Sequence, residues 1–383
     1  MENLQNKQTV KVLYISKYYY PYLGGVENIC KYLVEGVSKD FETAVVCFND
    51  CNKNQVDEVN GHKIYRVASQ LMIERQALSL SYHRMLKKAI REFQPDIIHF
   101  HAANPFPAAV LLMVIPKQVK LVIHWHMDIT KQRLIYPLVK PVETSLLKRA
   151  NLIVVTSPQY KESSIPLRPF LDKVVVVPNA MDCKNFEPKP NDAAVIQKIK
   201  EKFPQKIVFF VGRHIEYKGL PYLLKAEPFI QSDCDIVIAG TGPLTPKLKA
   251  ACKSSRVHFV GRLSDDDLRC FHYAASVFAF PSITRNEAFG VAIAEAQFCN
   301  TPVVTFTIPG SGVNWVNLNG VTGFEAPNKD VQAFAKAIDS LLQNESLANQ
   351  FAIAGKRRVE ENFTIEKMAK KMEEEYLQVM RNR

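Results

Sequence analysis

The feature that most constrains the fold is an alternation of short apolar runs with amphipathic segments, which occurs in two successive series. Continuous Val, Ile and Leu runs that alternate with helices are typical of a parallel sheet covered on both faces. The strands predicted in the first series are Val10–Ser16, Phe41–Phe48, Lys63–Ala68, Asp96–His101, Lys120–His126, Asn151–Thr156 and Lys173–Val177. Helical patterns lie between several of them, for example at Val26–Ser38, Tyr82–Phe93 and Lys131–Arg149.

A polar, proline-containing stretch over Asp182–Gln205 separates the two series. The strands predicted after it are Lys206–Gly212, Cys234–Ala239, Val257–Val260, Val277–Phe280 and Thr301–Phe306. The chain closes on a helical pattern over Thr364–Arg383. The sequence therefore predicts an α/β protein with two doubly wound, Rossmann-like parallel-sheet domains that face a central cleft, divided at residues 1–182 and 183–363.

The net charge of +11 is concentrated in the first half of the chain. Residues 1–180 carry 23 Lys and Arg against 15 Asp and Glu, a surplus of eight, and the remainder has a surplus of three. A basic first domain suits an anionic partner such as a phospholipid surface or a phosphate-bearing acceptor, although general solubility explains it equally well. No arginine-rich or aromatic-interleaved basic stripe points to nucleic acid.

The hydropathy pattern contains no run of apolar residues long enough to cross a bilayer. The opening Met1–Gln8 is polar and lacks the apolar core of a signal peptide. We therefore expect a cytoplasmic protein that contacts a membrane only as a peripheral protein on its inner face.

Two motifs in the first half could contact a ligand. Gly24 and Gly25 open the first helix soon after the first strand, and glycines at a helix N-terminus let an anion approach free N–H groups. A Gly-Gly turn needs no ligand, so this signal is weak alone. At the end of a later strand, His126 and Asp128 are candidates for contact with a sugar hydroxyl.

Metal binding is the weaker alternative. His124 and His126 share one face of a strand, but the sequence shows no third ligand beside them. Asp265-Asp266-Asp267 follows Ser264, which predicts an N-cap and an acidic first helical turn instead of a metal site. We therefore predict no metal and no other cofactor.

The first strand of the second half leads into a loop with two cations, Arg213 and Lys218, next to Gly212. Fixed cations aimed at a diphosphate stabilise the charge that develops on a leaving group and can replace a divalent metal. The alternative is a pair of solvated loop charges. A second glycine turn contains Gly242 but lacks the G-x-G-x-x-G spacing of a dinucleotide fingerprint, which argues against a dehydrogenase.

The most informative motif joins a loop to a buried helix. Glu287 lies in a loop after an apolar strand, and a helix opens at Phe289, Gly290 and Val291 with N–H groups free for a diphosphate. Glu295 lies about two turns along this helix among alanines. A buried carboxylate needs a partner, either a ribose diol or a structural Arg or Lys.

With these motifs in order, the chain resembles the retaining glycosyltransferases of family 4, which have the GT-B fold. The resemblance runs from Gly24-Gly25 to the final helix and includes Pro178-Asn179-Ala180-Met181-Asp182, Phe259-Val260-Gly261-Arg262 and Thr322-Gly323. The stretch Pro309–Trp315 is similar to a bacterial subgroup that acts on polysaccharide or lipid-linked oligosaccharide acceptors.

The resemblance implies a role for each matching residue. The implied catalytic residues are His126, Arg213, Lys218 and Glu287, and the implied donor-binding residues are Gly24, Gly25, Asp128, Gly212, Gly242, Phe289, Gly290, Val291 and Glu295. Arg213 and Lys218 would hold the diphosphate, Glu287 the donor sugar and Glu295 the ribose. The last helix, 364–383, would pack back on the N-terminal, acceptor-binding domain, and the C-terminal domain would bind the donor.

The function that these roles imply is transfer of a hexose from a nucleotide-sugar donor to a saccharide or lipid-linked acceptor, with retention at the anomeric carbon. GDP-mannose is the leading donor and a UDP-hexose the second. Two alternatives stay open: a UDP-sugar epimerase of the same fold, and a non-catalytic protein that binds nucleotide sugars.

Overall fold

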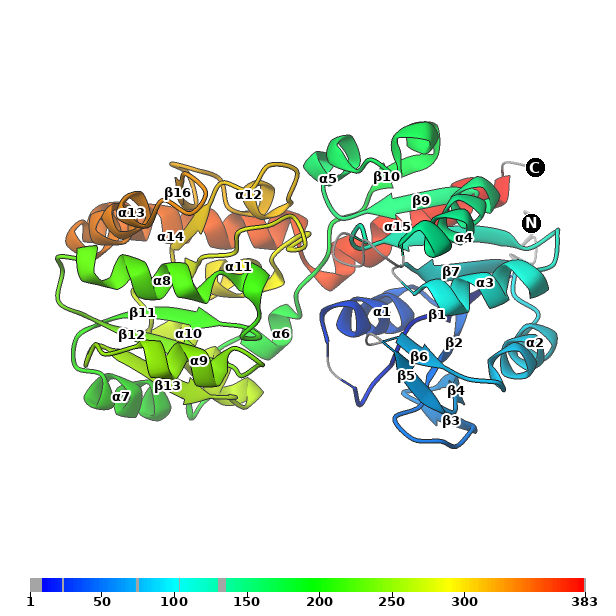
Figure 1. The fold of residues 1–383 in the computed structure, drawn as a ribbon, viewed down its shortest axis with the longest axis horizontal. Coiled ribbons are helices and arrows are strands. Elements are labelled where there is room, and N and C mark those ends of the chain that lie inside the picture. Colours follow the sequence, from blue (N-terminus) through cyan, green and yellow to red (C-terminus); the bar gives the residue numbers. More distant parts are fainter. Residues whose placement is uncertain (1–8, 23, 74–75, 103, 130–135, 382–383) are drawn as a thin grey trace, which may run out of the picture. The chain divides into compact units, whose positions relative to one another are not determined.

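The computed structural model describes residues 9–22, 24–73, 76–102, 104–129 and 136–381 (Figure 1). The chain divides into two compact units, Met1–Ala180 with Ile365–Arg383 (unit 1) and Met181–Thr364 (unit 2). None of the helices within the described ranges is long and apolar enough to span a bilayer.

In its described residues, unit 1 combines one large sheet, a small hairpin and seven helical segments. Its strands are β1 (Val10–Ile15), β2 (Phe41–Phe48), β3 (Gln55–Val59), β4 (His62–Val67), β5 (Leu71–Ile73), β6 (Gln76–Leu78), β7 (Ile97–His101), β8 (Lys120–Trp125), β9 (Leu152–Val155) and β10 (Val174–Val176). Its helices are α1 (Gly25–Gly36), α2 (Tyr82–Phe93), α3 (Pro105–Val114), α4 (Tyr136–Arg149), α5 (Pro158–Ser163), the 3-10 helix η1 (Arg168–Lys173) and α15 (Ile365–Arg381).

The large sheet of unit 1 has the strand order β10-β9-β8-β7-β1-β2-β4-β3. All neighbours are parallel except β3, which runs antiparallel to β4 at one edge. Because β1 lies between β2 and β7, the chain reverses its direction of winding between β1 and β7. Ligands of open α/β sheets bind outside the carboxyl ends of the strands at such a reversal.

The C-terminal helix α15 is part of the core of unit 1. Its residues Met368, Met372 and Tyr376 recur at helical spacing and are buried with apolar residues of α1 and of the sheet. The two helices pack closely, since a Cβ at Gly36 would lie 3.0 Å from Cγ2 of Ile365. Helix α15 therefore belongs to unit 1, although it follows unit 2 in the sequence.

Unit 2 contains one sheet and eleven helical segments. Its strands are β11 (Lys206–Val211), β12 (Cys234–Ala239), β13 (Val257–Gly261), β14 (Val277–Phe280), β15 (Val303–Phe306) and β16 (Gly323–Ala326). Its helices are α6 (Cys183–Phe186), α7 (Asp192–Lys202), η2 (Glu216–Lys218), α8 (Leu220–Ala226), η3 (Glu227–Phe229), α9 (Thr245–Ala251), α10 (Asp265–Ala274), α11 (Val291–Phe298), α12 (Val313–Val316), α13 (Val331–Gln343) and α14 (Glu345–Asn362).

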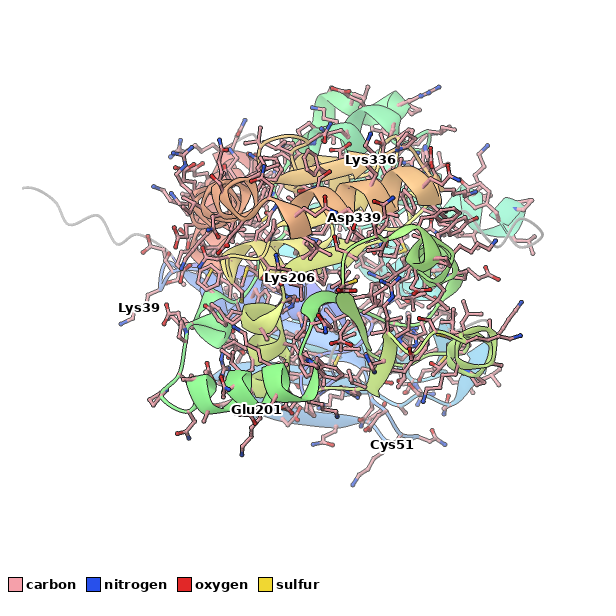
Figure 2. The ribbon with its side chains drawn as sticks, turned by 90° about the vertical axis from the view of Figure 1, so that its left-hand side faces the viewer. Lys39, Cys51, Glu201, Lys206, Lys336 and Asp339 are labelled. Atoms are coloured by element: carbon pink, nitrogen blue, oxygen red, sulfur yellow. The ribbon has the colours of Figure 1, made fainter. Side chains whose placement is uncertain are left out.

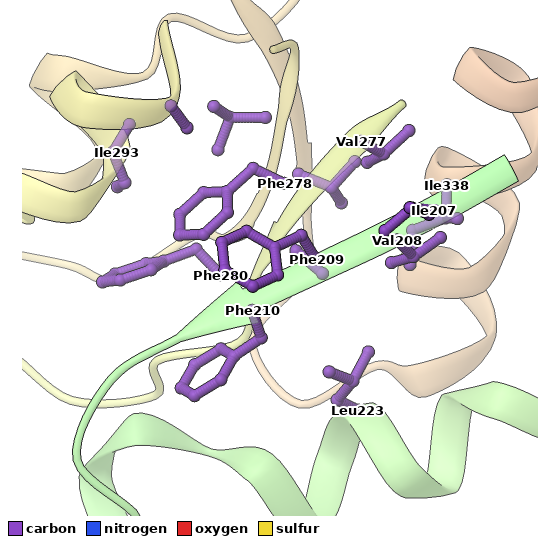
Figure 3. Packing of buried hydrophobic residues seen from close by; sticks show 14 of the residues in the cluster. Ile207, Val208, Phe209, Phe210, Leu223, Val277, Phe278, Phe280, Ile293 and Ile338 are labelled. Carbon is purple, nitrogen blue, oxygen red and sulfur yellow. The ribbon is translucent and has the colours of Figure 1, made fainter. Parts of the chain in front are cut away.

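The sheet of unit 2 is parallel throughout, in the order β13-β12-β11-β14-β15-β16, and reverses between β11 and β14. Strands β11, β12, β14 and β15 are buried on both faces. Phe210 and Leu223 lie on the α8 side of β11, while Phe278 and Ile293 lie on the other side (Figure 3). Helix α13 is tied to the preceding loops by Asp339 (labelled in Figure 2), whose carboxylate accepts the N–H groups of Gln231 and Ser232 at 3.0 and 2.9 Å.

The predicted fold class of two Rossmann-like parallel-sheet domains is confirmed, and every predicted strand is present. The predicted N-cap is also correct, since Ser264 Oγ accepts the N–H of Asp267 at 3.1 Å. Strands β3, β5, β6 and β16 were not predicted, because β5 and β6 have only three residues each and because β3 and β16 lack a continuous apolar run. The predicted helix Lys131–Arg149 is present as α4, with residues 131–135 outside the described ranges, as are Met1–Gln8 and residues 382–383.

Candidate functional site

The candidate site of unit 2 lies at the reversal of its sheet. Lys218 ends η2, shortly after β11, and Glu287 lies in the loop that follows β14. Gly219 lets the two loops touch: its φ is +68°, and a Cβ there would lie 1.8 Å from the carbonyl oxygen of Pro281. Only glycine fits this position. The carboxyl ends of the two central strands therefore bring Lys218 and Glu287 together.

Lys218 and Glu287 form an ion pair between Nζ and Oε2, with side chains only 14% and 12% exposed. The Lys218 ammonium also lies 4.9 Å from the centre of the Phe280 ring. Burial acts to lower the pKa of Lys218, but the Glu287 carboxylate and other nearby groups outweigh it, so that the pKa is raised. Lys218 is thus a cation fixed by its surroundings before any ligand binds.

The loop that carries Glu287 is held from two sides. Ser282 Oγ donates to Oε2 of Glu287 at 3.4 Å, and Ser311 Oγ donates to the Glu287 carbonyl oxygen. The N–H of Gly312 also bonds to the Ala288 carbonyl at 3.0 Å. The Pro309–Trp315 stretch, whose sequence suggested an acceptor class, thus packs within unit 2 against the Glu287 loop.

Glu295 lies on α11. This helix begins directly after Gly290, whose backbone is in the left-handed region at φ +89°. Burial raises the pKa of Glu295 to about 7, partly offset by Lys218. No described residue donates a hydrogen bond to its carboxyl group or pairs with it, although Lys218 is near enough to interact electrostatically. The predicted alternative of a structural Arg or Lys partner is therefore absent among the described residues, which leaves the carboxyl group available to a ligand.

Arg213 follows β11 and is exposed, with no ion pair to any residue that the structure describes. The nearby glycines have packing roles. A Cβ at Gly242 would lie 2.5 Å from the His214 carbonyl oxygen, and a Cβ at Gly212 would lie 3.1 Å from the Phe210 ring. Gly242 therefore serves the close contact between the loops after β11 and β12, and a ligand is not needed to explain it.

In unit 1, Gly24 caps α1 and Gly25 is its first residue. The backbone of Gly24 is extended, and a Cβ there would lie 2.2 Å from Oε2 of Glu27. Burial raises the pKa of Glu27, while Lys17 acts in the opposite direction. An acidic side chain thus lies beside the predicted anion-binding turn, a feature that the motif alone does not reveal.

His126 belongs to a cluster of four buried histidines at the carboxyl ends of β7 and β8, with His99, His101 and His124. Its Nε2 lies 2.8 Å from Nδ1 of His101. Burial lowers the pKa of all four rings, to about 3 for His126, so that they are neutral near pH 7. The sequence singled out His126 but gave no sign that His101 contacts it.

This cluster also supplies the third potential metal ligand that the sequence did not show. One ring nitrogen from each of His99, His101 and His124 lies within 4.8 Å of the others. The rings of His101 and His124 are stacked, however, at an interplanar angle of 19°. Because an imidazole lone pair lies in the ring plane, stacked rings do not direct their nitrogens at one ion.

Asp128 is held within unit 1. Its Oδ1 accepts hydrogen bonds from Trp125 Nε1 at 2.8 Å and from Ser164 Oγ at 2.7 Å, and its N–H donates to Tyr160 Oη at 2.6 Å. These bonds give Asp128 a structural role in fixing the segment after β8. Its contact with the donor sugar stays a prediction.

The structure thus brings the predicted residues together in two groups. Unit 2 gathers Lys218, Glu287 and Glu295, with Arg213 on the same loop as Lys218. Unit 1 carries His126 and the Gly24-Gly25 turn. The residues that sequence reasoning missed are Ser282, Ser311 and His101; the strand-end position of His101, two residues after His99, was the one available signal for it.

Solved structures share this architecture. A sucrose-phosphate synthase from Thermosynechococcus elongatus matches with a TM-score of 0.78 and 20% identity, covering 98% of this chain and 100% of the other. HepE from Anabaena, solved in complex with UDP, matches with a TM-score of 0.75 and 18% identity over 96% and 100% of the two chains. The protein therefore has the GT-B fold of glycosyltransferases.

Sequence comparisons give the family. A family model described as Glycosyltransferase Family 4 matches residues 23–185, and one described as Glycosyl transferases group 1 matches residues 205–344. The chain belongs to these glycosyltransferases, and the predicted family and hexosyltransferase activity are confirmed.

Two curated relatives align over most of the chain. The O-antigen chain mannosyltransferase C of Escherichia coli is 29% identical over 94% of this chain and 96% of its own length. The D-rhamnosyltransferase WbpZ of Pseudomonas aeruginosa is 29% identical over 89% of each chain.

Proposed function

We propose that this glycosyltransferase moves a hexose, with mannose from GDP-mannose as the leading candidate and a UDP-hexose as the second, onto a saccharide or lipid-linked acceptor in surface-polysaccharide assembly. The names of the two relatives support the sugar and the setting, since one transfers mannose to an O-antigen chain and the other transfers D-rhamnose. D-Rhamnose is 6-deoxymannose, so both sugars have the manno configuration.

The observation that carries this proposal is the fixed charge at the sheet reversal of unit 2. Lys218 is a buried cation, Arg213 an exposed cation without a described ion pair, and Glu295 a carboxyl group without a described partner. Two cations suit a diphosphate, and an ionised carboxylate accepts both hydroxyls of a ribose. Glu287, already bonded to Lys218, accepts hydroxyls of the transferred sugar.

In the proposed reaction the diphosphate departs first, with its growing charge stabilised by Arg213, Lys218 and the N–H groups at the start of α11. The acceptor hydroxyl, bound by unit 1, then attacks from the same face of the sugar. The departing phosphate takes its proton, so no side chain acts as a nucleophile, and the anomeric configuration is retained. His126 contacts the transferred sugar.

Nucleotide binding without metal tests the donor site. Calorimetric titration with GDP and with UDP, each in EDTA, is expected to show binding of one nucleotide. Arg213→Ala and Lys218→Ala should each weaken it at least about tenfold, or roughly 1.4 kcal/mol, because each removes a cation from the diphosphate. Arg213 is the cleaner variant, since it is exposed and its removal leaves no buried charge.

Lys225→Ala is the matched control, because Lys225 is an exposed lysine on the neighbouring helix α8. Its affinity should equal that of the parent protein. Binding that requires a divalent metal, or that ignores both Arg213 and Lys218, would mean that the donor site lies elsewhere.

Product analysis separates the remaining alternatives. A transferase needs an acceptor and yields a glycoside whose anomeric configuration, measured by NMR, matches that of the donor. An epimerase would convert the nucleotide sugar without any acceptor. A non-catalytic protein would bind the donor and show no turnover with any acceptor.

The proposed location is the cytoplasmic face of a membrane, with unit 1 as the docking surface. A surface hollow of about 680 Å³ is lined on one side by the α2 residues Arg84, Lys87, Lys88 and Arg91. Arg84, Lys87 and Arg91 are exposed and have no ion pair to a described residue. A row of unpaired cations on one helix attracts anionic lipid headgroups at about 1 kcal/mol per residue.

Charge reversal tests this surface. The double variant Lys87→Glu, Arg91→Glu is expected to bind vesicles containing phosphatidylglycerol at least about tenfold more weakly than the parent in a sedimentation assay. Added salt should weaken parental binding in the same direction. The variant Lys198→Glu, Lys200→Glu makes the same charge change on α7 of unit 2 and should bind normally. If both variants lose the same vesicle affinity, the vesicles are attracted by the net charge of the protein and α2 is not a dedicated docking surface.

A further inference from the structure

The histidine cluster of unit 1 is ordered by strand register. His99 and His101 lie two apart on β7, so their side chains share one face of the sheet. His124 lies opposite His101 in the register of β7 and β8, and His126 follows two residues later. All four side chains are at most 4% exposed. The cluster therefore lies at the ligand-binding edge of the sheet, and His126 is its most exposed member.

His126 is held by two contacts at once. Its ring stacks on His124, with centroids 4.3 Å apart and an interplanar angle of 11°. Its Nε2 forms a hydrogen bond with Nδ1 of His101 at 2.8 Å, and the planes of these two rings are nearly parallel, with an interplanar angle of 8°. A stack and a hydrogen bond together fix both the position and the rotation of the ring.

The bond between His101 and His126 can be written with either ring as the donor, since both are neutral. Nε2 of His101 decides between the two forms, because it is buried and has no partner among the described residues. If His126 were the donor, His101 would carry its proton on Nε2 as a buried N–H without an acceptor. Buried N–H groups without acceptors are rarer than buried acceptors without donors. His101 therefore donates from Nδ1, and His126 keeps its own proton on Nδ1.

A second chain of bonds has the same direction. Tyr376 of α15 donates to Tyr14 Oη at 3.0 Å, so its oxygen accepts the Nδ1 proton of His99 at 2.6 Å. Nε2 of His99 then accepts from Nδ1 of His124 at 3.3 Å. The buried Nε2 of His124 is left as an acceptor without a donor among the described residues. The C-terminal helix thus orients the ring on which His126 stacks.

We propose that His101 is a positioning residue that holds His126 as the Nδ1–H tautomer, so that His126 meets its ligand as a hydrogen-bond donor. A neutral imidazole in water prefers the Nε2–H form, so the protein imposes the minor tautomer. This inference rests on the proposed function in one respect: the ligand of His126 is the transferred sugar. An Nδ1–H group of His126 can donate a hydrogen bond to an oxygen atom of the sugar, but it cannot take the proton of the acceptor hydroxyl. This agrees with the proposed reaction, in which the departing phosphate takes that proton.

The tautomer can be measured without any turnover. In protein labelled with ring ¹⁵N histidine, two-bond ¹⁵N–¹H correlation spectra distinguish protonated from bare nitrogens, and His126→Gln identifies the His126 signals. We expect a protonated Nδ1 and a bare Nε2 for His126 near pH 7.5. His101→Asn keeps a side-chain donor at the place of Nδ1 and should keep this tautomer. His101→Ala leaves room for a water molecule that can accept a hydrogen bond, so His126 should shift toward Nε2–H.

The kinetic readout is a split between kcat and KM. His101→Ala is expected to lower kcat by about tenfold to a hundredfold, with the KM for the nucleotide sugar within about twofold, and His101→Asn should keep most of the parental kcat. His272→Ala is the matched control, because His272 is equally buried but lies in unit 2. Its kcat should be unchanged.

A parent protein with His126 protonated on Nε2, or with the same tautomer in His101→Ala, would overturn the inference. If His101→Ala does not fold, the spectra of the parent and of His101→Asn still decide it. The proposed function fails separately: a protein with the expected tautomer that binds no nucleotide keeps the inference about His101 and loses the assignment of the sugar as the ligand of His126.

Discussion

Acidification from about pH 7 to about pH 5 is expected to destabilise unit 1 far more than unit 2. Burial lowers the pKa of His99, His101, His124 and His126 below the ordinary value of 6.5. Below pH 6.5 the unfolded chain therefore binds protons that the folded unit excludes, so stability is complete above pH 6.5 and is lost as the pH falls. Below pH 6.5 each histidine contributes up to about 1.4 kcal/mol per pH unit, so all four together contribute up to about 6 kcal/mol per pH unit.

Carboxyl groups with raised pKa values act in the opposite direction, because the folded state takes up their protons first. In unit 1 these are Glu27 and Glu143, whose pKa values are raised by burial. In unit 2, burial lowers the pKa of His272 to about 3, and also lowers that of His214, but the raised pKa of Glu295 offsets part of this loss. The two units should therefore differ clearly in their dependence on pH.

The two tryptophans of the chain make this difference measurable, because Trp125 lies in unit 1 and Trp315 in unit 2. Urea unfolding followed by fluorescence in Trp315→Phe reports unit 1, and in Trp125→Phe it reports unit 2. His124→Gln added to Trp315→Phe should reduce the pH dependence of the free energy of unfolding of unit 1 by about the contribution of one histidine. If unit 1 depends on pH no more than unit 2, its histidines are not held neutral by burial.

Most of the fold could be predicted from the sequence because buried parallel strands are marked by their composition. Val12–Ile15 and Ile207–Val211 are continuous apolar runs, and each lies in a strand near the middle of its sheet. Strand β3 could not be predicted, since its residues Gln55 and Glu58 are exposed and its only partner is β4 at the sheet edge. Its extended form comes from cross-strand pairing, which leaves no apolar pattern in the sequence.

The site was predictable as a set of residues but not as a set of contacts. Lys218 and Glu287 were both candidates, yet their ion pair spans 69 residues and depends on β11 and β14 being neighbours. The bond between His101 and His126 likewise depends on the register of β7 against β8. Crossover helices set both strand order and register, and neither is encoded in a short motif.

Glu295→Gln is expected to stabilise unit 2 above pH 7 while it damages nucleotide binding. The pKa of Glu295 rises from 4.5 to about 7 on folding, mainly through burial. The folded state thus holds a proton that the unfolded chain has released, and stability falls as the pH rises from 4.5 through 7. By pH 8 the loss reaches up to about 3 kcal/mol. Glutamine keeps the shape of the side chain and removes this loss.

Urea unfolding in the Trp125→Phe background should therefore show a gain from Glu295→Gln at pH 8 and almost none below pH 4.5. The same variant should bind the nucleotide at least about tenfold more weakly at pH 8, because an amide cannot accept both ribose hydroxyls as a carboxylate does. Glu201 is an exposed glutamate on α7 (labelled in Figure 2), and Glu201→Gln should change neither quantity.

A gain in stability with unchanged affinity would mean that Glu295 is buried for another reason. Lost affinity without any gain would mean that Lys218 already compensates the buried charge. The expected combination would instead show that unit 2 keeps a destabilising carboxylate at its sheet reversal because the donor requires it.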